Sequence, residues 1–432
     1  MKQVKQGLVP KLRFREFEKD GEWEEKKVEE LFNLQDGYAF SSNEFIDNPI
    51  NSFQVIRITD INNHNKNRDK IYIPIHFEGE SEFKKYIAKK GDLLLSLTGA
   101  AGFNFFIWNS NPAIINQRTM KISLKDESNN ALKVLLSPLI YDKINAHGSG
   151  QNNNLSKESL RGVNFLIPKP AEQQKIADCL SSLDELIEAE DQKLEALQRH
   201  KKGLMQELFP ADGETLPRLR FPEFQSAPEW EEKPFSNFIK LYRGSSPRPI
   251  QEFLTKNNDG VNWIKIGDTK FSSNFIIGKV EEKITKKGAE RSRFVEIGEL
   301  ILANSMSYGK TYQLAINGCI YDGWFVLREY EDFFYKPFLL QLLNSDFMQK
   351  QYESLSAGGI VQNISSEVVY SSKLFHTSIP EQARIADFLI SIDEIINTQT
   401  KKLESLRLHK KGLMQQLFPN HNQEEIINHN KP

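Results

Sequence analysis

The clearest pattern in the chain is an apolar residue at every third or fourth position along two long stretches. A strict 3.5-residue repeat of this length favours a coiled coil over an amphipathic helix packed on its own domain. Two polar residues interrupt each apolar seam at matching places. The first seam comprises Ile176, Leu180, Leu183, Ile187, Glu190, Leu194, Leu197, Lys201, Leu204 and Leu208, and the second comprises Ile385, Leu389, Ile392, Ile396, Gln399, Leu403, Leu406, Lys410, Leu413 and Leu417.

Prolines mark the ends of both stretches. None lies between Pro170 and Pro210, or between Pro380 and Pro419. Each stretch is therefore predicted to be one helix of ~37 residues and ~55 Å, because proline would break a helix interior and each residue adds 1.5 Å.

Charge predicts how these helices pair. Residues 172–191 carry seven acids and one base, whereas residues 401–411 carry five bases and one acid. Antiparallel pairing places each acidic half beside a basic half, whereas parallel pairing would join the acidic halves. The helix dipole alone would also favour acids first and bases last in each helix. We expect an antiparallel two-helix coiled coil, which relates the two copies by a pseudo-two-fold axis.

The two helices belong to a longer internal repeat. Residues 172–210 and 381–419 align without a gap, with 24 of 39 positions identical. Upstream, residues 10–26 match residues 217–233. Solenoid repeats have periods of only ~20–50 residues, so this is a domain duplication. A chain of 432 residues also exceeds what one hydrophobic core usually supports.

The segments outside the helices have the character of α+β domains. Residues 53–60 and 261–268 alternate apolar and polar residues and end in an acid, and residues 91–96 and 298–303 are apolar runs that follow a glycine. These patterns predict short strands. The exposed loops differ between the copies, so one scaffold presents two different surfaces.

Composition narrows the class further. Cys179 and Cys319 are the two cysteines and have no counterpart in the other copy, which excludes a disulfide framework. The N-terminal sequence lacks an apolar stretch long enough for a signal peptide or membrane span, so we expect a soluble cytoplasmic protein without a membrane partner. The formal net charge of -2 means that any DNA affinity must come from local patches or from partners.

The order of variable domain and repeated helix resembles a known family. Each helix begins with Glu-Gln-x-x-Ile-Ala-Asp and ends with His-Lys-Lys-Gly-Leu-Met-Gln-x-Leu-Phe-Pro. The chain is similar from about Pro10 to Pro419 to the DNA-specificity subunit of bacterial type I restriction–modification enzymes. That family also has a Gly-x-x-Pro loop early in each domain. Gly244–Pro247 keeps it, whereas residues 37–40 read Gly-Tyr-Ala-Phe.

The resemblance implies the function. Each variable unit would be a target recognition domain that reads one half of an asymmetric bipartite target in double-stranded DNA. The coiled coil would set the spacer and dock two methyltransferase subunits. The subunit itself would carry no cofactor, with S-adenosylmethionine and ATP/Mg on partner subunits. Whether restriction or translocase subunits also bind is open.

The predicted organisation has five segments. Residues 1–165 form recognition domain 1, residues 166–210 the first conserved helix, residues 211–375 recognition domain 2, residues 376–419 the second conserved helix, and residues 420–432 a disordered tail.

Candidate DNA contacts follow from chemistry, since base edges are read by Arg, Lys, Asn and Gln, and phosphates by cations and small hydroxyl residues. A solvated surface residue is the alternative for each candidate. The set is Arg57, Asn62, Asn63, His64, Lys66, Arg68, Gln117 and Arg118 in the first domain, and Arg243, Ser245, Arg248, Lys265, Lys270, Arg291, Arg293, Tyr308 and Lys310 in the second.

Catalytic motifs were sought as well. Gly309-Lys-Thr resembles the end of a phosphate-binding loop, but Asn304 stands where the leading glycine is required, so a hairpin glycine is the better interpretation. The chain lacks the Pro-Pro-aromatic motif of adenine methyltransferases and any His/Cys cluster with metal spacing. His200 and His409 are predicted to be partner-facing or solvated. We expect a non-catalytic subunit.

Three alternatives remain open. They are a coiled-coil scaffold that binds no DNA, an enzyme with a cryptic active site in one globular unit, and a specificity subunit of a related system that reads bipartite sites.

Overall fold

The computed structural model describes residues 9–62, 70–75, 83–97, 105–108, 110–126, 129, 131–132, 134–135, 157–272, 274–305, 309–356 and 363–419. The chain divides into two compact units. Unit 1 combines residues 1–190 with 402–432, and unit 2 comprises residues 191–401. Both boundaries fall inside the long helices, so each unit contains a globular part and one portion of each helix. The five-segment division therefore stays a prediction, and its last segment lies outside the described residues.

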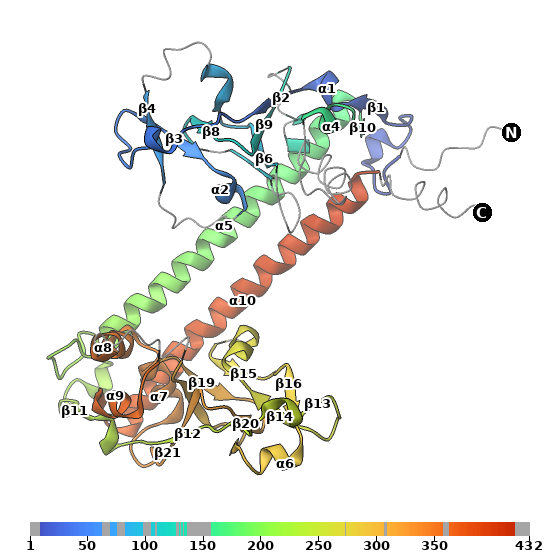
Figure 1. Ribbon diagram of the computed structural model, residues 1–432. Coiled ribbons are helices and arrows are strands. Elements are labelled where there is room, and N and C mark those ends of the chain that lie inside the picture. Colours follow the sequence, from blue (N-terminus) through green and yellow to red (C-terminus); the bar gives the residue numbers. More distant parts are fainter. Residues whose placement is uncertain are drawn as a thin grey trace. The chain divides into compact units, whose positions relative to one another are not determined.

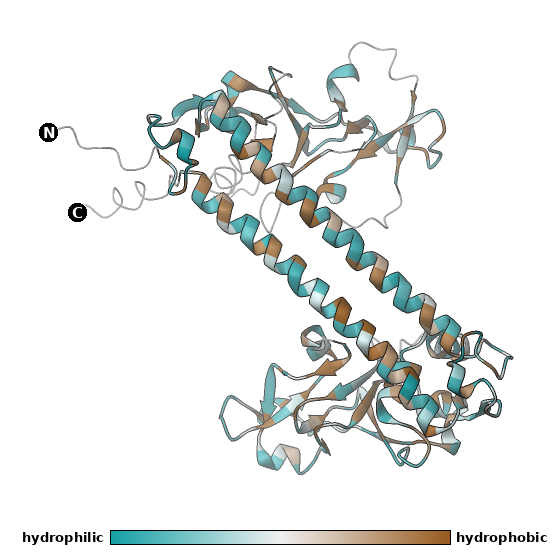
Figure 2. Cartoon of the chain, turned by 180° about the vertical axis from the view of Figure 1, so that it is seen from behind, coloured by the Kyte–Doolittle hydropathy of each residue, from teal (hydrophilic) through white to brown (hydrophobic). Residues whose placement is uncertain are grey.

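Two long helices are the largest elements (Figure 1), α5 (Pro170–Leu208) and α10 (Ile379–Leu417), each of 39 residues. Both end before the prolines that the sequence marks as stops. Every seam position is buried or half-buried, and Figure 2 shows apolar and polar residues alternating along both helices. The helices thus have one covered face, as the heptad pattern predicts.

The direction of the helix contacts can be followed inside each unit. In unit 1, Lys402 forms an ion pair of 2.5 Å with Glu190, and Lys410 forms one with Asp184. Residue numbers rise along one helix as they fall along the other. In unit 2, Lys201 Nζ lies 2.7 Å from Asp393 Oδ1. The contacts in each unit are antiparallel, whereas pairing along the whole length stays a prediction.

Unit 1 contains two four-stranded sheets and one two-stranded pair. The antiparallel sheet has the order β2 (Phe32–Asp36), β9 (Thr119–Leu124), β6 (Leu93–Ser96), β7 (Phe105–Ile107). The mixed sheet has the order β4 (Tyr72–Pro74), β3 (Ser52–Ile56), β8 (Ala113–Ile115), β5 (Ile87–Ala88), in which β3 and β8 are parallel. The pair is β1 (Glu24–Lys27) with β10 (Asn164–Ile167), and the short helices are α1 (Val28–Leu31), α2 (Ile58–Asn62) and α4 (Lys157–Arg161).

Unit 2 repeats this topology with one extra edge strand on each sheet. The first sheet has the order β12 (Lys240–Arg243), β21 (Trp324–Arg328), β18 (Leu300–Ala303), β19 (Thr311–Leu314), β15 (Ile276–Ile277). The second has the order β13 (Leu254–Thr255), β16 (Glu282–Ile284), β14 (Val261–Ile264), β20 (Gly318–Ile320), β17 (Arg293–Val295). The remaining elements are β11 (Glu231–Pro234) paired with β22 (Lys373–His376), and α6 (Lys286–Ala289), α7 (Lys336–Leu343), α8 (Asp346–Ser356) and α9 (Ser366–Ser371).

The predicted α+β class and the internal repeat are confirmed. The buried strands expected after Gly91 and Gly298 are β6 and β18. The strands expected at residues 53–60 and 261–268 are shorter than predicted. Each turns into a helical segment, because the side chain of Asp60 accepts a hydrogen bond from the Arg57 amide, and Asp268 accepts one from the amide of Lys265.

A buried ion pair anchors the start of each long helix. Arg13 Nη2 lies 2.7 Å from Glu172 Oε2, and Arg220 Nε lies 2.7 Å from Glu381 Oε1. All four side chains are at most 8% exposed. Within each unit, the ion pair joins the repeated Leu-Arg-Phe segment to the repeated Glu-Gln at the start of the long helix. Both partners of the pair therefore belong to sequence that the two copies share.

Candidate nucleic-acid interface

The same close backbone crossing occurs in both units. The amide of Gly37 donates to Thr119 O, and the amide of Gly244 donates to Trp324 O. A Cβ atom at Gly37 would lie 1.9 Å from Asn116 O, and one at Gly244 would lie 2.0 Å from Tyr321 O. Only glycine fits at such a contact. The first unit therefore keeps the geometry of the Gly-x-x-Pro loop although Phe40 replaces the proline.

In unit 2, the loop that follows Gly244 surrounds Asp322. The Ser246 hydroxyl donates to Asp322 Oδ1, and Arg243 Nε donates to Asp322 O over 3.2 Å. The Ser246 hydrogen bond and the cations Arg248 and Arg243 lower the pKa of Asp322, and burial opposes them. Asp322 is therefore ionised at neutral pH.

Five further predicted contacts lie around this loop. Arg291 and Arg293 stack over the rings of Phe253 and Tyr242, at 5.4 and 5.6 Å from the ring centroids. Stacking fixes their guanidinium groups while leaving donors available. Ser245 and Arg248 are both exposed, and the backbone carbonyl of Ser245 accepts a hydrogen bond from Ser292 Oγ. The fifth residue is Lys265, whose Nζ lies 2.7 Å from Glu282 Oε1.

A pocket of about 820 Å³ opens beside the loop. Its lining combines Arg248, Lys265 and Asp322 with the apolar surfaces of Ile250 and Trp263. The structure thus brings together at one edge of unit 2 a group of hydrogen-bond donors, with the carboxylates of Asp322 and Glu282 in the adjoining pocket. The donors are Arg243, Ser245, Arg248, Lys265, Arg291 and Arg293.

In unit 1, Gln117 and Arg118 occupy the positions that Asp322 and Gly323 hold in unit 2. Both are exposed, and Arg118 has a φ of 62°, in the left-handed region that few non-glycine residues adopt. Arg57 matches Lys265 in the repeat, and its guanidinium pairs with Asp60 at 3.2 Å. These three predicted residues lie around the equivalent crossing.

Aromatic side chains line the loop of unit 1. The ring of Tyr38 contacts those of Phe40, Phe83 and Tyr86, with centroids 4.7, 4.9 and 5.4 Å away. The corresponding loop of unit 2 has two serines and a proline and borders the open pocket. The two units therefore offer different surfaces on one framework.

The other predicted contacts are not brought to this site or lie outside the described part of the chain. Lys270 pairs with Glu281 at 2.6 Å and is not among the residues that line the pocket. Burial lowers the pKa of Lys310, which is half-buried near Asp346. Asn63, His64, Lys66, Arg68 and Tyr308 are outside the described residues, as is the side chain of Asn62.

Asp322 and Ser246 were not selected from the sequence, although both face the loop. The predicted set consists of cationic, amide, hydroxyl and imidazole side chains and contains no acidic residue. The structure places Asp322 where unit 1 has Gln117, because Tyr38 and Ser245 donate their amides to the equivalent carbonyls of Ile115 and Ile320.

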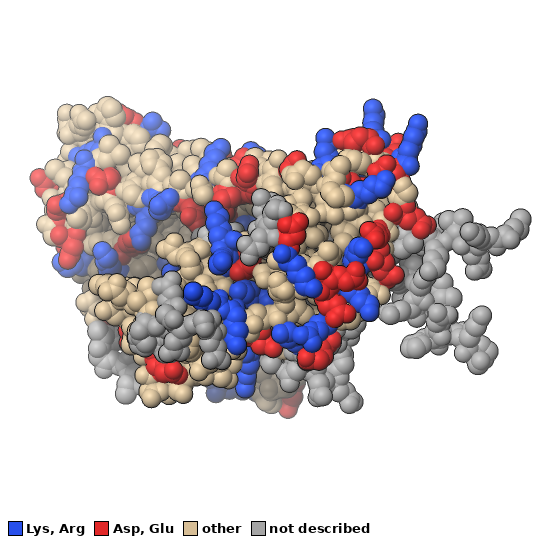
Figure 3. Space-filling model, turned by 90° about the horizontal axis from the view of Figure 1, so that it is seen from above, with Lys and Arg blue, Asp and Glu red and all other residues tan. Residues whose placement is uncertain are grey.

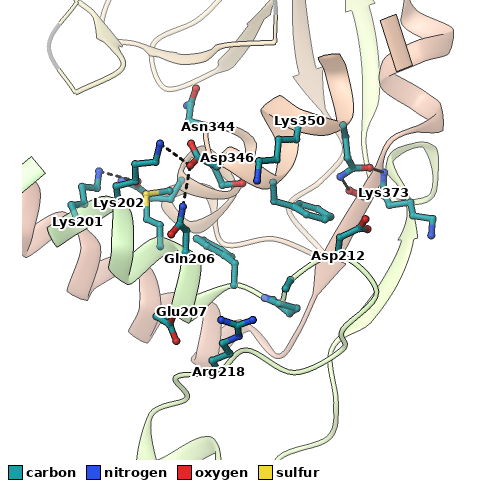
Figure 4. Close-up of a pocket in the computed structure, with 18 of the residues that line it drawn as sticks. Lys201, Lys202, Gln206, Glu207, Asp212, Arg218, Asn344, Asp346, Lys350 and Lys373 are labelled. Atoms are coloured by element: carbon teal, nitrogen blue, oxygen red, sulfur yellow. Dashed lines mark hydrogen bonds and ion pairs between the residues drawn. The ribbon is translucent and has the colours of Figure 1, made fainter. Parts of the chain in front are cut away.

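A second pocket of unit 2, of about 890 Å³, lies where α5 ends (Figure 4). Lys202 Nζ and Gln206 Nε2 both contact Asp346 Oδ2, at 3.0 and 3.3 Å. Lys350 and Arg218 add further positive charge to the lining. This pocket contains part of the repeated His-Lys-Lys-Gly-Leu-Met motif, whose His200 and His409 are both exposed.

Acidic and basic side chains are interspersed over the surface shown in Figure 3, so no single sign of charge covers it. In the part of the chain that the structure describes, no cluster of three or more His, Cys, Asp or Glu side chains could hold a metal ion. Over the same residues, no helix is both long and apolar enough to cross a membrane.

Comparisons with known proteins give the class of protein. Residues 20–199 match the family model of the Type I restriction modification DNA specificity domain. The type I restriction enzyme MjaVIII specificity subunit of Methanocaldococcus jannaschii is 24% identical over 348 residues, which cover 78% of this chain and 80% of that protein. The EcoBI specificity subunit of Escherichia coli is 28% identical over 191 residues, covering 44% and 38%.

Solved structures share the fold. The S subunit of a type I restriction–modification system from M. genitalium has a TM-score of 0.55 at 16% identity, covering 96% of this chain and 100% of that one. A chain from a structure on complex assembly of the type I R-M system has a TM-score of 0.56 at 14% identity, covering 92% and 98%. The family match over residues 20–199, the two relatives and the shared fold together support a specificity subunit of a type I restriction–modification system.

Proposed function

We propose that each unit reads one half of an asymmetric bipartite DNA target, and that the chain itself carries no chemistry. The observation that supports this is the crossing at Gly37 and Gly244. It has the same backbone hydrogen bonds in both units but presents different side chains. A shared framework with unlike exposed groups suits two different half-sites.

The side chains at the crossing favour different base edges. An ionised carboxylate accepts hydrogen bonds only, so Asp322 suits the amino group of cytosine or adenine in the major groove. Gln117 has both a donor and an acceptor and suits the paired groups of adenine. Arg248 and Arg118, both exposed, suit guanine or the phosphates.

The repeated helices would dock the partner subunits. Leu186 and Ile395 occupy equivalent positions and are exposed apolar residues, at 41% and 52%. Exposed His200 and His409 are likewise equivalent. Two equivalent surfaces support two methyltransferase subunits per chain. S-adenosylmethionine, ATP and Mg would belong to the partner subunits, and restriction or translocase subunits would join through that complex.

The test of half-site reading is methylome sequencing of cells that express this chain with its methyltransferase. We expect one asymmetric motif of two unlike half-sites around a fixed spacer. A palindromic motif would contradict the reading by two different units. The scaffold alternative predicts that the complex shows no salt-sensitive binding to duplex DNA, which a filter-binding titration measures directly.

The role of the helices as a spacer has its own test. Deleting Glu190–Ala196 together with Gln399–Ser405 removes one heptad from each helix and keeps the seam in phase. The helices shorten by ~10 Å, or ~3 base pairs, at 1.5 Å per residue and 3.4 Å per base pair. The spacer should contract while both half-sites persist. An unchanged spacer in a folded, active variant would show that the helices do not set the spacer length.

A further inference from the structure

A basic groove lies over strands β2 and β9 of the antiparallel sheet in unit 1. It has a volume of about 540 Å³ and is lined by five cationic side chains and one acidic side chain, Glu29. The cations come from three separate segments of the fold, and they are Lys85, Lys121, Lys125, Lys157 and Arg161. Lys121 lies on β9, Lys125 directly follows β9, and Lys85 lies in the helical turn before β5. None of the five cations was among the predicted DNA contacts.

The alternation of side chains along the strands builds this groove. On β9, Met120, Ile122 and Leu124 point into the core, so Lys121 and Ser123 point outward. On β2, Asn33 lies opposite Ser123, and Gln35 lies opposite Lys121. This face of β2 and β9 therefore carries three neutral polar side chains, Asn33, Gln35 and Ser123, beside Lys121.

Some groove cations are held in place by backbone groups. Lys121 Nζ donates to Ile87 O over 2.7 Å, and Lys125 Nζ donates to Glu29 O over 2.6 Å. These neutral acceptors orient the ammonium groups and leave their charge in place. An ammonium group has three donors, so Lys125 can bind an anion besides the Glu29 carbonyl.

The same face of unit 2 is charge-balanced. Lys240 and Tyr242, which match Asn33 and Gln35, both contact Glu329. Arg328, which matches Ser123, pairs with Glu299 at 2.6 Å. In unit 1, Arg161 Nη1 lies 3.9 Å from Glu158 Oε1, but the groove lining itself holds five cations and one acid. The matching face of unit 2 pairs each of its two cations with a carboxylate.

We infer that the basic groove binds the phosphate backbone of duplex DNA beside the first half-site. Several cations with neutral donors beside them suit a polyanion, and phosphate contacts carry no direct information about base sequence. The strand β2 leads from the groove to Gly37 at the crossing, so one duplex contacting Gln117 could continue over the sheet. This inference rests on the proposed DNA-reading function and adds a sequence-independent contact that is confined to unit 1.

The experiment neutralises three groove cations in the full chain bound to its methyltransferase. The variant Lys125→Gln/Lys157→Gln/Arg161→Gln is compared with the charge-keeping Lys125→Arg/Lys157→Arg/Arg161→Lys. Lys11→Gln/Arg15→Gln/Lys19→Gln is the matched control, because it removes the same charge from exposed residues of unit 1 outside the groove. DNA affinity is measured over a range of salt concentrations for cognate and random duplexes.

Neutralisation should make the negative slope of log association constant against log salt concentration shallower by about 2 to 3. It should also weaken binding roughly 10- to 100-fold at about 0.1 M salt. Cognate and random DNA should lose affinity equally, and the methylated motif should not change. The charge-keeping variant should match the wild type, and the control should change the slope by less than about 1. If the triple variant unfolds, Arg161→Gln alone should lower the slope by about 1.

Three results would overturn the inference. These are an unchanged salt slope, an altered motif, and a loss of methyltransferase assembly with DNA affinity intact, which would make the groove a docking surface for an acidic protein. Failure of the proposed function is distinct, because the wild-type complex would then show no preference for any duplex while the groove could still contribute to random binding.

Discussion

Replacing Arg220 with methionine tests whether the buried ion pair holds the start of α10. Arg220 contacts both oxygens of Glu381 at 2.7 and 2.8 Å and also donates to Ala227 O and Pro228 O. Thr377 Oγ1 and Trp230 Nε1 complete the carboxylate shell, at 2.6 and 3.3 Å. The substitution leaves a buried carboxylate with two of its donors and strands two carbonyl groups.

Removing one partner of a buried pair costs about 3–5 kcal/mol. For a unit of this size, 1 kcal/mol shifts Tm by about 2–4 °C, so Tm of unit 2 should fall by about 6–20 °C. The double variant Arg220→Met/Glu381→Leu should recover part of that loss, because no unpaired charge remains, although Trp230 and Thr377 lose their acceptor. Differential scanning calorimetry of the full chain measures both values.

Hydrogen exchange locates the effect. Faster exchange is expected around residues 220–234 and 373–390, while residues 11–27 and 164–180 of unit 1 keep their protection. Arg13→Met is the matched variant and should reverse this pattern, since Arg13 pairs with Glu172 in the same way. A loss below about 1 kcal/mol for Arg220→Met, or a larger loss for the double variant, would refute the reasoning.

Three further predictions concern the crossing and the ion pair. Gly37→Ala and Gly244→Ala should each destabilise the chain by several kcal/mol in thermal melts, because the new Cβ would overlap a carbonyl oxygen, whereas Gly162→Ala, with open space around it, should be nearly neutral. Asp322→Asn adds a donor, so methylome sequencing should show one position of the second half-site relaxed and the first half-site unchanged; a motif identical to that of the wild type would contradict this role. Burial raises the pKa of Glu381, but Arg220, Thr377 and Trp230 outweigh it and hold that pKa below the ordinary 4.5. The ionised Glu381 carboxylate therefore stabilises the fold fully above pH 4.5, and this stabilisation is lost as pH falls through the pKa of the folded state. The difference in Tm between the wild type and Glu381→Gln should narrow below about pH 4 and should not narrow between about pH 6 and 8.

The candidate interface was only partly predictable. Donor chemistry selected Arg243, Arg248 and Arg293, which the structure brings to one loop. It did not select Asp322, because an acid in a loop gives no signal until its neighbours are known. Lys270 and Lys310 were selected by the same rule but lie elsewhere, since side-chain type says nothing about which edge of a sheet a residue reaches.

The sequence alone determined the features that depend on local spacing. The seam period and the flanking prolines gave both long helices to within a few residues, and the repeat gave two copies of one α+β unit. Helix period, proline geometry and strand alternation act over a few neighbouring residues, so they can be read along the chain.

Tertiary structure decided the features that join distant segments. The parallel pairing of β14 with β20, the contact of Arg220 with Glu381 161 residues away, and the gathering of groove cations from three segments all require loops to close. Which distant segments meet depends on core packing and loop-closure entropy, which local patterns do not contain. The sequence therefore determined what the two units are built from, and the fold decided that Asp322 lies at the crossing loop of unit 2 and that a basic groove forms in unit 1.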